Sequence, residues 1–187
     1  MENISLLIGM TVLVLLVLGG ILGWVFYRSR RSARLQDKFG PEYNHTVEEL
    51  GSTHKAESEL DARKKHVESL EIRSLSAIER DRYLVDWTAV QSKFVDEPGK
   101  AIISADHLIM EVMQLRNYPV ADFEQRAADL SVRYPDLVSN YRLARAIALK
   151  NEQKTANTEE LRQAMVYDKS LFSELVVTEN PVEMEKV

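Results

Sequence analysis

The run ISLLIGMTVLVLLVLGGILGWVFY, residues 4–27, contains no charged side chain and decides how the rest of the chain is organised. As an α-helix rising about 1.5 Å per residue, it is roughly 36 Å long, enough to cross a hydrocarbon core of about 30 Å with some tilt. A single segment can satisfy its backbone hydrogen bonds in lipid only as a helix. The sequence therefore predicts a transmembrane helix over residues 4–27, preceded by a short extracytoplasmic N-terminus, residues 1–3.

Two alternatives fit this run less well. A cleaved signal peptide has a positively charged start, a shorter apolar core and a small-residue cleavage site. Here Met1-Glu2-Asn3 carries no Lys or Arg, and the run ends in the bulky residues 24–27. An amphipathic core helix would show a polar face, and this run shows none. We therefore expect an uncleaved anchor.

The flanks of the predicted span indicate its orientation. Lys and Arg are retained on the cytoplasmic side of a membrane, and aromatic residues settle at its interfaces. The chain therefore predicts an outside N-terminus and a cytoplasmic domain. The expected membrane-interface residues are Trp24, Tyr27, Arg28, Arg30, Arg31 and Arg34. Within the span, Gly19 and Gly23 have the G-x-x-x-G spacing that lets two helices approach closely, so they are candidates for a helix–helix contact and self-association.

Composition restricts what the remaining residues do. The first 34 residues hold four Arg and one Glu, and the chain carries a net charge of −5, so residues 35–187 carry −8. An acidic domain argues against nucleic-acid binding, which requires a basic face. The chain has no cysteine, which excludes disulfides, thiolate zinc sites and cysteine nucleophiles.

Beyond the anchor, every periodic segment has helical spacing, and the fold class is predicted to be all-α. Residues 28–51 form a basic juxtamembrane segment and a short helix, separated at Gly40-Pro41 because proline cannot donate within a helix. Residues 52–74 are highly charged with a thin apolar stripe, typical of a short coiled-coil seam. We interpret this segment as an exposed helical stalk that either leans on the domain or pairs with a partner.

Residues 75–177 are predicted to form a compact bundle of about five helices, and residues 178–187 a disordered acidic tail. Start signals divide the bundle: a capping box of Ser76 and Glu79, and expected caps at Asp96 and Asp122. Tyr134-Pro135 ends one helix and opens the next, and residues 157–160 supply a further start. No 34-residue repeat recurs, so a bundle is favoured over a solenoid.

Four stretches carry a resemblance: RLQDKFGPEY (34–43), FVDEP (94–98), DFEQRAADLS (122–131) and LRQAM (161–165). They resemble a family of uncharacterised bacterial proteins that pair an N-terminal membrane segment with a helical domain of this length. The resemblance covers nearly the whole chain and implies a bacterial, membrane-anchored protein. It implies no activity and no catalytic residue.

Motifs for chemistry are sparse. Glu42-x-x-His45 has the spacing of di-iron bundles, but those need two such pairs, so we interpret both residues as surface residues at a helix start. His107, on the edge of an apolar stripe, is expected to be structural. The zinc-protease, P-loop, dinucleotide and nucleophile-elbow motifs are missing. We therefore predict no catalytic, cofactor-binding or metal-binding residue.

One charged run is a candidate interaction face. Arg126 and Arg133 flank Asp129, and one interpretation is a surface that binds an acidic or polar partner motif. A solvated outer face with local ion pairs explains the same pattern. The leading functional hypothesis is a non-enzymatic interaction or scaffold module with an unidentified protein partner. The alternatives are a lipid-binding or envelope-stress element working through residues 28–34, and, least favoured, an enzyme using Glu124 or Asp129.

Overall fold

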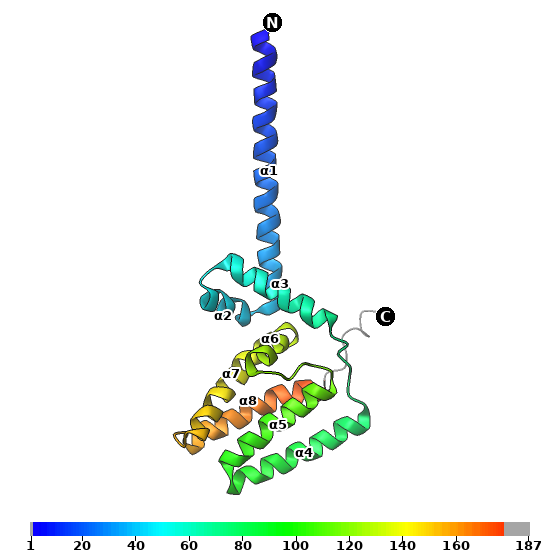
Figure 1. Ribbon diagram of the computed structural model, residues 1–187, viewed down its shortest axis with the longest axis vertical. Helices are drawn as coiled ribbons and strands as arrows, with labels where there is room; N and C mark the ends of the chain where they lie inside the picture. Colours follow the sequence, from blue (N-terminus) through cyan, green and yellow to red (C-terminus); the bar gives the residue numbers. More distant parts are fainter. Residues whose placement is uncertain (1, 178–187) are drawn as a thin grey trace. The chain divides into compact units, whose positions relative to one another are not determined.

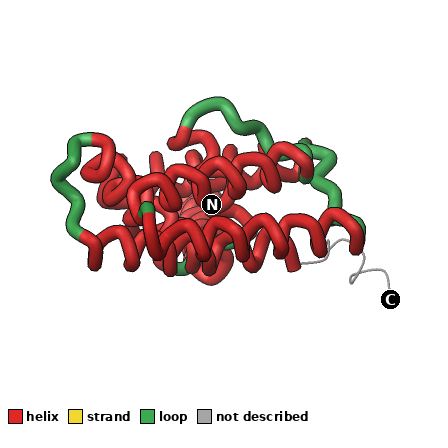
Figure 2. The backbone as a smooth tube through the Cα atoms, turned by 90° about the horizontal axis from the view of Figure 1, so that it is seen from below, coloured by secondary structure: helices red, strands yellow, loops and turns green. Residues whose placement is uncertain are grey.

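The computed structural model describes residues 2–177, and over these residues the chain is helical and contains no β-strand (Figures 1 and 2). The side chains of residues 2–9, 11–15, 17, 21, 24 and 25 lie outside the description, as do Met1 and the predicted tail, residues 178–187. Two units result, Met1–Lys38 and Phe39–Val187. The all-α prediction is confirmed.

The first unit is built from α1, Glu2–Phe39, which continues without a break through the apolar run and the arginines that follow it. Over the described residues, no helix of the chain combines the length and the apolar character needed to cross a membrane. Most of the predicted span, residues 4–27, falls on positions whose side chains lie outside the description.

The described side chains of α1 are exposed as far as Arg30, whereas Leu35 is 5% exposed and Phe39 is 0% exposed near its end. Tyr27 is 71% exposed, and the guanidinium of Arg30 lies 4.3 Å from the ring centroid of Phe26. At Gly19 and Gly23, an added Cβ would meet nothing within 4 Å, so this face of the helix is open within one chain. Trp24, predicted at the membrane interface, has a side chain outside the description.

The second unit is a helical bundle, and its helices pack on neighbours both near and far along the chain. Within it, α4 packs on α5 and α8, α7 packs on α6, α8 and α2, and α3 packs on α2 and α6. Its elements are α2 (Pro41–Leu50), α3 (Thr53–Ser69), α4 (Ala77–Asp96), α5 (Pro98–Leu115), α6 (Phe123–Arg133), α7 (Pro135–Glu152) and α8 (Thr158–Val177).

Most helix starts follow the local signals. Ser76 and Glu79 form a reciprocal capping box at α4, and Asp122 accepts from the backbone N–H of Gln125 at α6. One expected cap is wrong: Asp96 is the last residue of α4, and α5 begins at Pro98 without a side-chain cap. Proline needs no donor partner in the first turn, so this start is tolerated uncapped.

The core of the second unit lies between α4, α5, α7 and α8. Trp87 stacks on Phe172 with ring centroids 4.5 Å apart, and Ile109, Val112 and Leu171 are fully buried. Each such large apolar side chain contributes about 1.5–3 kcal/mol on burial. Tyr83 and Trp87 are the buried residues of α4 and face this core.

The segment predicted as a stalk belongs to this unit. Ala56 and Leu60 are fully buried and Val67 is 2% exposed, because α3 packs between α2 and α6. Of the two alternatives for this segment, the structure shows the one in which it packs on the domain. The unit therefore begins at Phe39 rather than at residue 75, with α2 and α3 added to the five helices expected.

Candidate functional site

Two half-buried arginines of the second unit converge on the buried carboxylate of Glu42. Its side chain is 1% exposed, and Arg142 donates to it in a bidentate manner, Nη1 to Oε2 at 2.6 Å and Nη2 to Oε1 at 2.8 Å. Arg63 Nη1 donates to the same Oε1 at 2.9 Å, and Arg63 Nε to Glu59 at 2.9 Å. This set, the Glu42 clamp, joins α2, α3 and α7 through charge-assisted bonds.

The prediction that Glu42 lies on the surface is therefore wrong. Its carboxylate is occupied by two guanidinium groups, whereas His45 is 46% exposed and lies 3.9 Å from Glu49. Glu42 and His45 therefore contact different partners. In the part of the chain that the structure describes, no three His, Cys, Asp or Glu side chains are grouped to hold a metal ion.

The predicted interaction face at residues 126–133 is also wrong in its geometry. Arg126 is 6% exposed, Asp129 is 0% exposed and Arg133 is half-buried. Arg126 and Asp129 therefore form neither an exposed partner-binding face nor a solvated outer face. Asp129 Oδ1 accepts from Gln125 Nε2 at 2.9 Å and lies 3.6 Å from His66 Nε2 of α3. Burial raises the pKa of Asp129, and the Gln125 hydrogen bond and the charges of His66 and Arg63 oppose that shift.

A second polar chain crosses the bundle through Tyr141 of α7. Arg126 Nε donates to the Tyr141 hydroxyl at 3.2 Å, and this hydroxyl donates to Asp106 Oδ1 of α5 at 3.4 Å. The guanidinium of Arg126 also lies 5.7 Å from the ring centroid of Phe123. Asp168 of α8 is near Asp106 and only 3% exposed. Burial first, and then the negative charge of Asp106, raise the pKa of Asp168 well above its usual value.

A fully buried arginine closes the end of the bundle where α5 and α8 finish. Arg116 Nη1 donates to the Leu175 carbonyl at 2.7 Å and to the Tyr134 hydroxyl at 3.1 Å, and its Nε donates to the Arg73 carbonyl at 3.1 Å. The last carbonyls of a helix lack intrahelical donors and carry partial negative charge. Arg116 therefore stabilises the end of α8 and holds the connection before α4.

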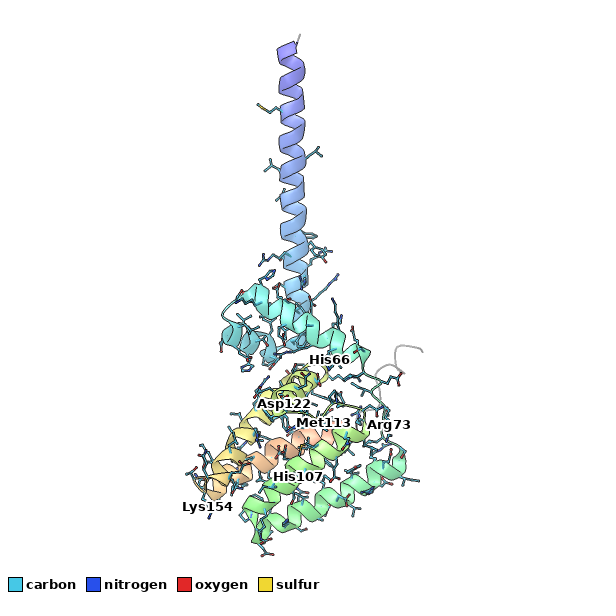
Figure 3. All side chains as sticks on the ribbon, viewed as in Figure 1. His66, Arg73, His107, Met113, Asp122 and Lys154 are labelled. Carbon is cyan, nitrogen blue, oxygen red and sulfur yellow. The ribbon has the colours of Figure 1, made fainter. Side chains whose placement is uncertain are left out.

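Taken together, these groups connect different helices of the second unit. Glu42, Asp129, Arg126 and Arg116 each contact a side chain or carbonyl of another element. Glu124 and His107 are exposed, and Figure 3 shows where His66, His107 and Asp122 lie along the helices. Three of these charged residues, Arg116, Arg142 and Asp168, are not among the predicted site residues. For Asp168 a signal was present, since it interrupts the apolar stripe of α8 between Met165 and Leu171.

Comparison of this chain with protein-family models, with curated proteins and with solved structures finds no match.

Removing the negative charge of Glu42 tests how much the clamp contributes to the stability of the domain. We predict that Glu42→Gln lowers the free energy of unfolding by about 1.5–3 kcal/mol, because two half-buried guanidinium groups lose the charged partner of their hydrogen bonds. Urea unfolding followed by tryptophan fluorescence measures this, with the buried Trp87 as reporter. The matched control is Glu49→Gln on the same helix, whose side chain is 55% exposed and whose effect should stay within about 0.5 kcal/mol. Equal effects of the two variants would contradict a clamp.

The buried carboxyl of Asp168 gives a pH dependence with a definite sign. Because its pKa is raised in the folded chain, it contributes stability that is complete below the unfolded pKa of about 3.9 and is lost as the pH rises through the raised value. We predict that Asp168→Asn matches the wild type near pH 4 and has a higher Tm at pH 7–8, since the amide is never charged. Melting curves across this range measure the difference. A variant that is less stable at pH 8 would contradict the assignment.

Proposed function

We propose that this chain is a non-enzymatic interaction or scaffold module, held at the bacterial inner membrane by one N-terminal span with its helical domain in the cytoplasm. The observation that carries the proposal is the single helix α1, in which a charge-free run of 24 residues is followed directly by four arginines. Such a run is long enough for the hydrocarbon core, and retained arginines mark the cytoplasmic side.

Exposed apolar side chains on α1 support a non-aqueous surrounding for this helix. Leu16 and Leu22 are each 69% exposed, Met10 is 61% exposed and Leu18 is 50% exposed. Apolar surface left in water costs about 25 cal/mol per Å², so a row of large apolar side chains favours a cover of lipid or of a second helix. Self-association through Gly19 and Gly23 is part of the same proposal.

The use of charge inside the domain supports an interaction role. Glu42, Arg63 and Arg142 are committed to one another, and Arg116 is committed to the end of α8. These side chains fix helix positions, which leaves the outer helix faces as the surfaces offered to other molecules. The resemblance to bacterial proteins with a membrane segment and a helical domain agrees with this arrangement.

Membrane topology is the first experiment. The chain has no cysteine, so Ser139→Cys, exposed on α7, places one thiol on the domain. We predict that a membrane-impermeant maleimide labels this thiol only after the cells are permeabilised, and that the protein stays in the membrane pellet after alkaline carbonate washing. Labelling in intact cells would overturn the cytoplasmic placement, and release into the wash would overturn the anchor.

The interaction role is tested separately by photo-crosslinking in cells. A photoreactive residue is placed at exposed positions of α4 and α7, and the control is residues 1–39 alone with the reactive residue at exposed Arg34. We predict that the full chain gives discrete crosslinked products that the control lacks. If both give the same products at every position, the domain has no interaction role.

A further inference from the structure

A polar groove lies where α4, the end of α5 and the connection before α4 meet. Arg73, in this connection, is labelled in Figure 3. The connection is fixed to the end of α5, because Asn117 Nδ2 donates to the Glu71 carbonyl at 2.8 Å and Arg116 Nε donates to the Arg73 carbonyl at 3.1 Å. The groove, called here the Tyr83 groove, has a volume of about 400 Å³ and is lined by Arg73, Tyr83, Glu111, Gln114, Leu115 and Asn117.

The hydroxyl of Tyr83 is a buried polar group at this groove. Tyr83 is only 5% exposed, yet it is one of the residues that line the groove. Within the described part of the chain, its hydroxyl makes no hydrogen bond. Buried hydroxyls in folded proteins are nearly always hydrogen-bonded. This hydroxyl is therefore available to a polar group that enters the groove.

Two further residues add acceptor oxygens. Glu111 is exposed on α5, and its carboxylate forms no ion pair with any described residue. The side-chain amide of Asn117 is held by its bond to the Glu71 carbonyl, which uses Nδ2 and leaves Oδ1 as an acceptor. Tyr83, Glu111 and Asn117 thus offer oxygens to an incoming donor.

The positive charge of the groove is already neutralised. Arg73 Nη1 donates to Glu79 Oε2 at 2.9 Å, and Arg73 Nη2 donates to Glu79 Oε1 at 2.8 Å. These bonds, together with the backbone N–H of Ser76, lower the pKa of Glu79 to about 2. Glu79 is therefore ionised at neutral pH and balances Arg73. The unbalanced charge of the groove is the carboxylate of Glu111.

The surroundings of the Tyr83 hydroxyl are negative as well. Burial first, and then the charge of Glu111, raise the pKa of Tyr83. Arg82 opposes this shift, but its guanidinium lies 3.7 Å from the Asp86 carboxylate and 5.5 Å from the Tyr83 ring centroid. Arg82 is therefore occupied within α4, and it does not line the groove. A cation is the ligand charge that these groups favour.

We propose that the Tyr83 groove binds an arginine side chain of a partner protein. This inference rests on the proposed interaction role and gives the chemistry of one contact. A guanidinium presents five donors and bonds a carboxylate through two parallel hydrogen bonds, which suits Glu111, while the oxygens of Tyr83 and Asn117 accept its remaining donors. The methylene stem of the arginine packs on Leu115. An acidic ligand is disfavoured, because Arg73 is already paired and Glu111 repels it.

A pair of small probes tests the preference for charge. The full chain in mild detergent is titrated with the blocked tripeptide acetyl-Gly-Arg-Gly-amide and with the same peptide containing citrulline, which keeps the shape of arginine but has no charge. Binding is followed by the NMR signals of the Asn117 and Gln114 side-chain amides. We expect the arginine peptide to bind about tenfold more tightly, because hydrogen bonds between charged groups are the stronger ones. Equal affinities of the two peptides would overturn the proposal.

Substitutions in the groove test the residues. Glu111→Gln should lower the affinity for the arginine peptide about tenfold, and Tyr83→Phe, which keeps the ring, about fivefold. The matched control is Glu124→Gln, also exposed but on α6, which should leave the affinity unchanged. Circular dichroism and thermal melting check that each variant stays folded. The same affinity for the Glu111→Gln and Glu124→Gln variants would contradict binding in this groove.

Crosslinking in cells separates this inference from the broader interaction role. A photoreactive residue at Gln114 should give a product that Glu111→Gln removes, and mass spectrometry should locate an arginine in the crosslinked partner peptide. If products form from α7 while the Gln114 product is indifferent to Glu111→Gln, the groove is wrong and the interaction role stands. If no position of the domain gives a product that residues 1–39 alone lack, the interaction role fails, and the partner inferred here fails with it.

Discussion

The second unit depends on one buried carboxylate. Glu42 accepts from Arg63, 21 residues later, and from Arg142, 100 residues later. Taking the Glu42 carboxylate out of water is unfavourable unless it is closely paired, and the bidentate bond from half-buried Arg142 with the further bond from half-buried Arg63 supplies that pairing. Because the carboxylate can be satisfied only where α2, α3 and α7 meet, the clamp specifies one arrangement of these helices among the many that apolar packing alone would allow.

Other buried polar and charged side chains connect further helices of the bundle in the same way. His66 and Asp129 connect α3 to α6, while Arg126, Tyr141 and Asp106 connect α6, α7 and α5. Arg116 then ties the end of α5 to the end of α8 and to the segment before α4. Each contact is polar and directional, so it fixes the rotation and register of a helix as well as its distance.

The sequence predicted helix ends well because they depend on neighbours a few residues away. The Ser76–Glu79 capping box, the Asp122 cap and the Tyr134-Pro135 boundary all act within four residues, and all are present. Asp96 failed because a helix that opens on Pro98 needs no side-chain cap. The segment over residues 52–74 looked exposed because its apolar stripe is thin, and the partners that complete its burial lie on α2 and α6. In the local sequence pattern, Glu42 and Asp129 resemble charged residues on a solvent-exposed face. The arginines and the histidine that lie beside them in the folded chain come from other helices.

This domain departs from the usual distribution of polar and apolar residues both in its interior and on its surface. In the interior, Glu42, Arg116 and Asp168 occupy positions where apolar side chains would be buried at a lower desolvation cost. On the surface, Ile78, Val85 and Val95 expose apolar side chains at positions where polar residues are usual. The interior charges are explained by the specificity that they impose on helix packing, as the clamp shows. The exterior valines and isoleucine have no such role within one copy of the chain, because α4 is already held by Tyr83 and Trp87 on its other face.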